Sequence, residues 1–177
     1  MESFSYEVSR APSNSPATFL ETLVNNDIAA LNDLKNSISS EAIEQAVTLL
    51  QEAETIYVLG QLRSFSVAYN IRYLLLYLRQ NVRLLDGSGG LATEEAELMS
   101  EKSLLVAVSF RYYAREVVDI VEGTARKNIP ILAITDSQLS PLNKHATCSL
   151  VVPGAGHKFS YSLATTMCLA QSLIISM

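Results

Sequence analysis

Two stretches of the chain decide its fold: IYVLGQLRSFSVAYNIRYLL at Ile56–Leu75 and LLVAVSFRYYAREVVDIV at Leu104–Val121. Each starts as a run of apolar β-formers and ends abruptly in hydroxyl and guanidinium side chains, after which a helical pattern begins. A helix N-terminus presents free backbone N–H groups and the positive end of the helix dipole, so it binds anions readily. The two junctions are therefore candidate walls of a phosphate pocket.

The alternation of strand and helix continues through the chain. Short continuous apolar runs, typical of a parallel sheet covered on both faces, predict strands at Ile56–Leu59, Val82–Leu85, Leu104–Ser109, Ile131–Thr135 and Ser149–Val152. Helical patterns are expected at Ser64–Arg79, Ala92–Met99, Tyr113–Lys127, Pro141–Ala146 and Phe159–Ser176. Right-handed crossovers then give an α/β fold, a three-layer αβα sandwich with a five-stranded parallel sheet. Ligands of such sheets bind at the carboxyl ends of the strands, near a topological switch point.

Two helices are expected ahead of the sheet. Ser15 and Pro16 form a good N-cap and N1 pair for an amphipathic helix that runs to about Lys35. A second helix is capped by Ser39 or Ser40. Residues 1–15 have a linker-like composition, so we expect a linker remnant there and a single domain over residues 16–177.

Composition narrows the class of protein. The chain has 177 residues, is 49% hydrophobic and carries a formal charge of −5, which fits one domain with a full core and argues against a nucleic-acid surface. The polar N-terminus is not a signal peptide, and the apolar stretch Leu163–Met177 is too short and too broken by polar residues to span a bilayer. Cys148 and Cys168 lack metal-ligand spacing and are expected to be buried thiols in a reducing cytoplasm.

At the first junction, Gly60 permits a tight exit from the strand and is followed by polar residues. A serine at this position is also an ordinary N-cap. Arg63 favours an anion site, because capping needs no guanidinium whereas phosphate recognition favours one. The motif is not a dinucleotide fingerprint, since Leu62 occupies the middle glycine position. The candidate ligands from this turn are Gln61, Arg63, Ser64 and Ser66.

The second junction contributes Ser109 and Arg111, whereas Arg115 and Glu116 are expected to form a solvated pair on the helix surface. Ser137 follows the fourth strand, where it is either a turn residue or a contact to a ligand hydroxyl. The glycine-rich segment 86–90 is expected to be a flexible connection that borders the pocket.

No residue pattern indicates turnover. The sources of a catalytic base are limited to Glu94, Glu95, His145 and His157. The loop that contains His157 and Lys158 is a candidate cover for a ligand, from its own subunit or from a neighbour. No cofactor and no metal ion are expected, because no His, Cys or carboxylate set has ligand spacing.

These segments resemble the SIS (sugar isomerase) family of phosphosugar-binding domains, and in particular the sensing half of RpiR-type bacterial transcriptional regulators. The segments that carry the resemblance are GQLRSFSVAYNIRYLL, VRLLDGSGGLATEEAEL, LLVAVSFRYYAREVVDIVEGTARKNIPILAITDSQLSPL and FSYSLATTMCLAQSL. The preceding LETLVNNDIAALNDL resembles the helix between the DNA-binding and sensing halves of those regulators.

The resemblance implies that Ser64 is the phosphate-binding serine of the first turn and that Ser109 is the leading serine of the second. Isomerase members continue the second turn as Ser-Gly-Glu-Thr, whereas this chain has Arg111-Tyr112-Tyr113-Ala114. Ala114 removes a hydroxyl that would hold phosphate, so backbone N–H groups, Arg63 or Arg111 would have to compensate. The glutamate and histidine that isomerase members use for proton transfer have no clear counterpart here.

The resulting hypothesis is a non-enzymatic, cytoplasmic effector domain that senses a phosphorylated sugar or sugar acid. It would contact DNA only through an N-terminal helix-turn-helix domain absent from this sequence, and it would assemble as a homodimer or homotetramer. A phosphosugar isomerase and a purely structural dimerisation domain are the alternatives.

Overall fold

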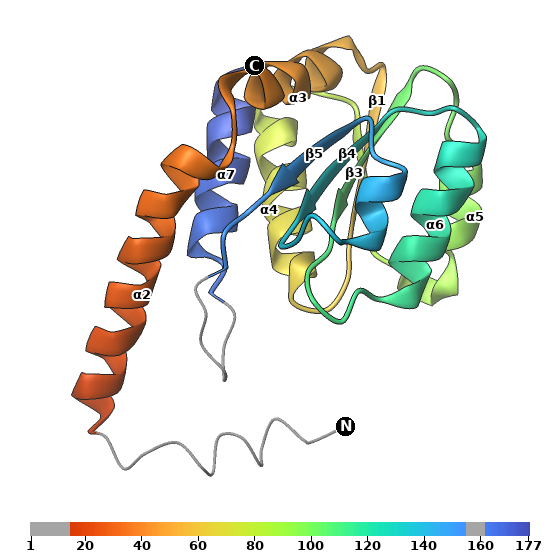
Figure 1. Cartoon of the computed structure of the whole chain (residues 1–177). Coiled ribbons are helices and arrows are strands. Elements are labelled where there is room, and N and C mark those ends of the chain that lie inside the picture. Colours follow the sequence, from red (N-terminus) through yellow and green to blue (C-terminus); the bar gives the residue numbers. More distant parts are fainter. Residues whose placement is uncertain (1–14, 155–161) are drawn as a thin grey trace.

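The computed structural model describes residues 15–154 and 162–177, and its centre is a five-stranded parallel sheet (Figure 1). The strands are β1 (Thr55–Gly60), β2 (Val82–Leu85), β3 (Ser103–Val108), β4 (Ile131–Thr135) and β5 (Cys148–Val151), in the order β2-β1-β3-β4-β5. All four neighbouring pairs are parallel, which confirms the predicted fold class.

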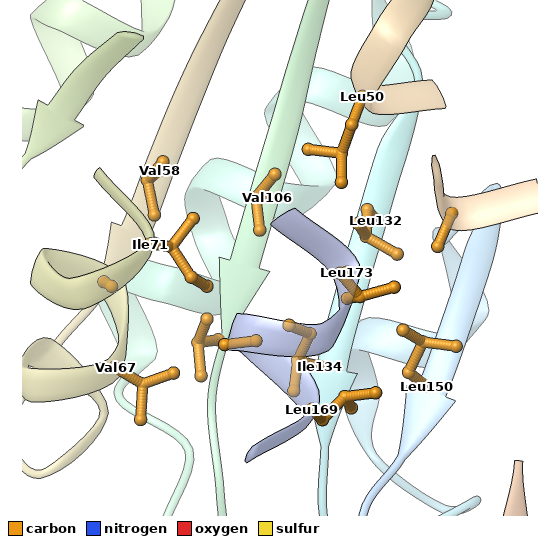
Figure 2. Packing of buried hydrophobic residues seen from close by; sticks show 14 of the residues in the cluster. Leu50, Val58, Val67, Ile71, Val106, Leu132, Ile134, Leu150, Leu169 and Leu173 are labelled. Carbon is orange, nitrogen blue, oxygen red and sulfur yellow. The ribbon is translucent and has the colours of Figure 1, made fainter. Parts of the chain in front are cut away.

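Helices cover both faces of the sheet, because successive strand side chains point to opposite sides. Ile56 and Val58 of β1 belong to a core shared with α3 (Ser40–Glu52), α4 (Ser64–Tyr77) and α7 (Ala164–Ile175) (Figure 2). Tyr57 and Leu59 belong to a second core beneath α5 (Ala92–Glu97) and α6 (Arg115–Arg126). The three layers are therefore helix, sheet and helix.

Helix α2 (Pro16–Ser37) packs against α7 and projects away from the sheet (Figure 1). The Ser15 hydroxyl caps it by accepting the Thr18 N–H at 3.2 Å. The cap of α3 is Ser39 rather than Ser40, because the Ser39 hydroxyl accepts the Ala42 N–H at 3.2 Å.

Several predicted boundaries need correction. The segment after β4 forms a short 3-10 helix, η2 (Pro141–Lys144), because β5 begins at Cys148 and leaves no room for an α-helix to Ala146. The predicted flexible connection contains a second 3-10 turn, η1 (Ser88–Gly90). Helix α7 is described from Ala164, so the predicted start at residue 159 lies outside the described residues.

Both cysteines are free thiols, but only Cys148 is buried. Cys168 is exposed on α7, so the prediction that it is buried was wrong. Among the described residues, no helix is long and apolar enough to cross a membrane.

Candidate functional site

The two turns singled out in the sequence meet at one edge of the sheet. β1 and β3 are neighbours, and the chain continues from β1 to β2 on one side and from β3 to β4 on the other. Such a switch point opens a crevice at the carboxyl ends of the strands. A cavity of about 120 Å³ lies here, lined by Gln61, Leu62, Arg63, Ser64, Ser109, Phe110, Arg111, Tyr112 and Ala114.

Five of the seven predicted ligands line this cavity: Gln61, Arg63, Ser64, Ser109 and Arg111. Ser66 is exposed on the first turn of α4, outside the described lining. Ser137 also lies outside it, and its hydroxyl accepts the Leu139 N–H at 3.1 Å, as expected for a turn residue. His157 and Lys158 lie outside the described residues.

The first turn is held tightly against the start of α4. A Cβ atom on Gly60 would lie 2.8 Å from the Ser64 carbonyl oxygen, so only glycine allows this close approach. The Ser64 N–H donates to the Gln61 carbonyl at 3.1 Å, and the Ser64 side chain is buried. The N-cap residue is Arg63, and no side chain caps this terminus. Ser64 is therefore not an N-cap, and it is one of the residues that line the cavity.

The second turn is anchored by Asp136, which follows β4. Its two carboxylate oxygens accept the Arg111 backbone N–H and the Tyr113 hydroxyl, each at 2.9 Å. Burial, and then the hydrogen bond to Asp136, raises the pKa of Tyr113 above its ordinary value. This role of Asp136 was not predicted from the sequence, although its position after β4, the strand next to β3, was an available signal.

Both turns contain a non-glycine residue in the left-handed region. Leu62 has φ 56° and Tyr112 has φ 74°, and both side chains are exposed. Residues other than glycine seldom adopt this conformation. The other two described examples, Arg79 and Asn128, follow the C-caps of α4 and α6, whereas Leu62 and Tyr112 lie in the turns that line the cavity. Each left-handed residue is next to an arginine, Arg63 or Arg111, that lines the cavity.

The start of α6 forms the second uncapped terminus. Its N-cap residue is Ala114, and no side chain caps it. Glu116, in the first turn, accepts a hydrogen bond from the Gln61 amide and so ties the two turns together. Arg115 pairs with Asp119 at 3.7 Å, so the prediction that it pairs with Glu116 was wrong. The sequence missed the role of Glu116, because its partner lies 55 residues away.

The charge around the cavity suits an anion. Arg63 and Arg111 line it, and the Arg111 guanidinium lies over the Tyr112 ring at 5.4 Å. Ser109 is buried at the end of β3, with its N–H bonded to the Ile134 carbonyl at 3.1 Å. Within residues 15–154 and 162–177, no three metal-ligating side chains gather.

A larger hollow, of about 370 Å³, lies at the opposite edge of the sheet, where the strands begin. Its charged lining is Glu52, Glu54, Glu101 and Lys102, and Lys102 is paired with Glu54 at 2.6 Å. Carboxylates repel a phosphate, so size alone does not identify the anion site.

The parallel αβα fold with a switch-point cavity defines a class of small-molecule-binding α/β domains. Within that class the family model "SIS domain" matches residues 49–176, and the chain therefore belongs to the SIS family. The match confirms the resemblance to the SIS family that the sequence indicated.

Three relatives illustrate the match. The sugar isomerase domain of an RpiR transcription factor from Sphaerobacter thermophilus is 29% identical, with a TM-score of 0.83 over 87% of this chain and 86% of that one. The Vibrio vulnificus NanR protein complexed with ManNAc-6P is 20% identical, with a TM-score of 0.80 over 98% of this chain and 66% of that one. The uncharacterized HTH-type transcriptional regulator YbbH of Bacillus subtilis is 24% identical over 88% of this chain and 54% of its own length.

The curated relatives are longer than this chain, which spans 20% to 54% of their length. Solved structures with the same fold also include proteins described as phosphosugar isomerases, at 15% to 18% identity.

Proposed function

We propose that this chain is the effector-binding domain of a transcriptional regulator, and that it senses a phosphorylated sugar or sugar acid between the β1 and β3 turns. The observation that carries the proposal is the convergence of two uncapped helix starts, two buried serines and two arginines on one small cavity. Helix N-termini and guanidinium groups are the protein groups that bind phosphate best.

The cavity has room for only one part of the proposed ligand. At about 120 Å³ it is smaller than the roughly 300 Å³ at which pockets for drug-sized ligands begin, so it suits the phosphate group alone. Ser64 and Ser109 would donate to the phosphate oxygens, with Arg63 and Arg111 adding charge. The sugar would lie outside, against the exposed ring of Tyr112.

Gln61 has a separate role in this arrangement. Its side-chain amide nitrogen donates to the Glu116 carboxylate, which can only accept, so the amide is oriented with its side-chain oxygen, Oε1, as the atom that can accept from a ligand. A carbonyl oxygen accepts from a sugar hydroxyl and repels a phosphate. We therefore assign Gln61 to the sugar and not to the phosphate.

Similarity to regulators supports the sensing role. The RpiR domain of Sphaerobacter thermophilus is a transcription-factor domain, and NanR was solved with a phosphosugar, ManNAc-6P. By this proposal DNA is contacted through a separate domain of a full-length regulator in the cytoplasm, and the effector domain forms a homodimer or homotetramer.

The alternative function is phosphosugar isomerisation, which fold neighbours described as isomerases favour. Isomerisation needs a base near the C1–C2 bond. Glu94 and Glu95 lie on α5, on the other face of the sheet from α4, and Glu116 is the carboxylate that contacts Gln61. Nuclear magnetic resonance spectra of each candidate phosphosugar, recorded with the protein over hours, would show conversion if the chain is an isomerase.

The test is thermal unfolding against a panel of phosphosugars, their unphosphorylated forms and inorganic phosphate. A ligand at about 100 times its Kd stabilises the native state by roughly 2.7 kcal/mol, which is readily measured. We expect one phosphosugar to raise Tm, and Ser64→Ala or Ser109→Ala to abolish the rise. Ser66→Ala is the matched control, because Ser66 is a neighbouring serine outside the cavity lining and should leave the rise unchanged. No shift across the panel would contradict the proposal and favour a dimerisation domain.

A further inference from the structure

Glu116 brings a negative charge close to a cavity that is proposed to bind an anion. It lies in the first turn of α6, and the N-cap residue of that helix, Ala114, lines the cavity. A carboxylate in the first turn stabilises a helix through its dipole, from any side of that turn. The dipole therefore accounts for an acidic residue here but not for its partner, because the Glu116 carboxylate accepts a hydrogen bond from the Gln61 side chain, 55 residues away.

The hydrogen bond between Gln61 and Glu116 determines how the Gln61 amide is turned. A glutamine amide has a donor end and an acceptor end, and a carboxylate can bond only to the donor end. A hydrogen bond to a charged group is stronger than one between neutral groups. Both side chains are half-buried, which limits the competition from water. Gln61 is therefore held with Oε1 as the end that a ligand can meet.

This orientation sets a requirement on the ligand next to its phosphate group. Gln61 lines the same small cavity as Ser64 and Ser109, so the part of the ligand that meets Gln61 is the part joined directly to the phosphate. There Oε1 accepts a hydrogen bond from a hydroxyl group, whereas it repels a keto, ether or carboxylate oxygen, which cannot donate. A site that bonds one polar group and leaves another unpaired discriminates strongly between the two.

We infer that Glu116 is a positioning residue: by orienting the Gln61 amide, it makes the site select phosphate esters that carry a hydroxyl group within two carbons of the phosphorylated carbon. Esters with only a keto, ether or acid oxygen at that place are rejected. The inference rests on the proposed function, because it takes the anion in the cavity to be a phosphate ester. The charge of Glu116 then lowers the affinity for anions in general and raises the discrimination among them.

The test compares glycerol 3-phosphate with its two mono-O-methyl ethers, in each of which one hydroxyl becomes an oxygen that can only accept. Amide nuclear magnetic resonance titrations of the ¹⁵N-labelled chain give the Kd of each ester and of inorganic phosphate. We expect the wild type to bind glycerol 3-phosphate at least about 10-fold more tightly than one of the ethers, because one hydrogen bond is replaced by two facing acceptors. In Glu116→Gln this ratio should fall to about 2, since a neutral amide partner allows both orientations of the Gln61 amide.

The ratio of the two Kd values separates the orientation of Gln61 from the charge of Glu116. Removing that charge changes the affinity for every phosphate ester in the same sense, so the Kd of inorganic phosphate should stay the same or fall while the ratio drops. Glu122→Gln is the matched control, because it makes the same substitution on the same helix, where Glu122 lies 3.9 Å from His145, and it should leave the ratio unchanged. Thermal unfolding checks that the variants fold. Gln61→Met, which removes the amide, should lower the ratio at least as far as Glu116→Gln does.

A second measurement needs no ligand. The Nε2 protons of Gln61, assigned by their absence in Gln61→Met, should resonate downfield of those of the exposed Gln138 and should move in Glu116→Gln. Unchanged Nε2 signals would overturn the inference, as would a ratio that Glu116→Gln leaves intact or a wild type that binds the ester and both ethers equally. In those three cases phosphate binding, and with it the proposed function, still stands. If none of the four probes binds, the phosphate cavity itself is contradicted and the inference fails with it.

Discussion

At the scale of single residues, the two left-handed positions, Leu62 and Tyr112, shape the site most directly. Their side chains are 79% and 76% exposed, so these residues bury little and their influence acts through the backbone. The turns that line the cavity depend on a conformation that glycine adopts without cost.

Substitutions at Leu62 measure the free-energy cost of the left-handed conformation. A left-handed residue other than glycine costs about 1–2 kcal/mol. We expect Leu62→Gly to leave the free energy of unfolding unchanged or to raise it by up to about 1 kcal/mol, after the larger chain entropy of glycine is included. Leu62→Val should lower it by about 1–2 kcal/mol, because a β-branched side chain fits this region worst. Urea unfolding of the two variants checks the order, and a Leu62→Gly variant less stable than Leu62→Val would contradict it.

Tyr113 should make the stability of the folded chain depend on pH in the alkaline range. Burial, and then the hydrogen bond to Asp136, raises the pKa of Tyr113 above the ordinary value of 10.0. As pH rises through that value, the unfolded chain loses the proton first and therefore binds fewer protons than the folded chain. The contribution to stability is complete below pH 10 and is lost as pH rises towards the folded pKa.

We expect Tyr113→Phe to be less stable than wild type near neutral pH by about 1 kcal/mol, the net value of one hydrogen bond. Above pH 10 the difference should shrink. Unfolding curves from pH 7 to pH 11 test this, and a difference that stays constant over the whole range would contradict it.

Individual residues also show how far the sequence predicts the site. Ser64 and Ser109 were predictable because the ends of two strands can be located from sequence: Ser109 directly follows an apolar run, and Ser64 lies in the turn after another. Asp136 and Glu116 were not, because their partners lie 25 and 55 residues away and only the tertiary fold brings them together.

At the scale of elements, the contact between β1 and α4 determines where the start of α4 lies. A Cβ atom at Gly60 would approach the Ser64 carbonyl oxygen at 2.8 Å and the Ala68 Cβ atom at 2.9 Å. The carbonyl belongs to the backbone of the helix start and cannot move away without shifting the whole first turn.

We therefore expect Gly60→Ala to lower the free energy of unfolding by about 1–3 kcal/mol, as overpacking does. It should also abolish any phosphosugar-induced rise in Tm. Gly123→Ala is the matched control, because Gly123 lies in α6 and the nearest side-chain atom to an added Cβ there, Arg126 Nη2, would be 3.7 Å away. That variant should gain about 0.5–1 kcal/mol. Equal effects of the two substitutions would contradict this account of Gly60.

Element type was more predictable than element ends. Five strands followed from continuous apolar runs, and Ser15 and Ser39 act as caps as the sequence indicated. The 3-10 helix η2 and the end of β3 at Val108 depend on the space between neighbouring strands, which a local pattern does not contain.

At the scale of the whole molecule, strand order creates the site. Because β1 and β3 are neighbours, two turns separated by nearly fifty residues line one cavity. The sequence predicted the parallel sheet but not this order, since order is decided by which crossovers pack on which face.

The central claim is that phosphate binds between the starts of α4 and α6, and amide nuclear magnetic resonance tests it most directly. The ¹⁵N-labelled chain would be titrated with the phosphosugar that raises Tm, and then with its unphosphorylated form. We predict that the largest shifts fall on residues 61–66 and 109–116 and occur only with the phosphorylated form. Shifts confined to residues 52–54 and 101–103, around the acidic hollow at the opposite edge, would contradict the account, as would equal shifts with the unphosphorylated sugar.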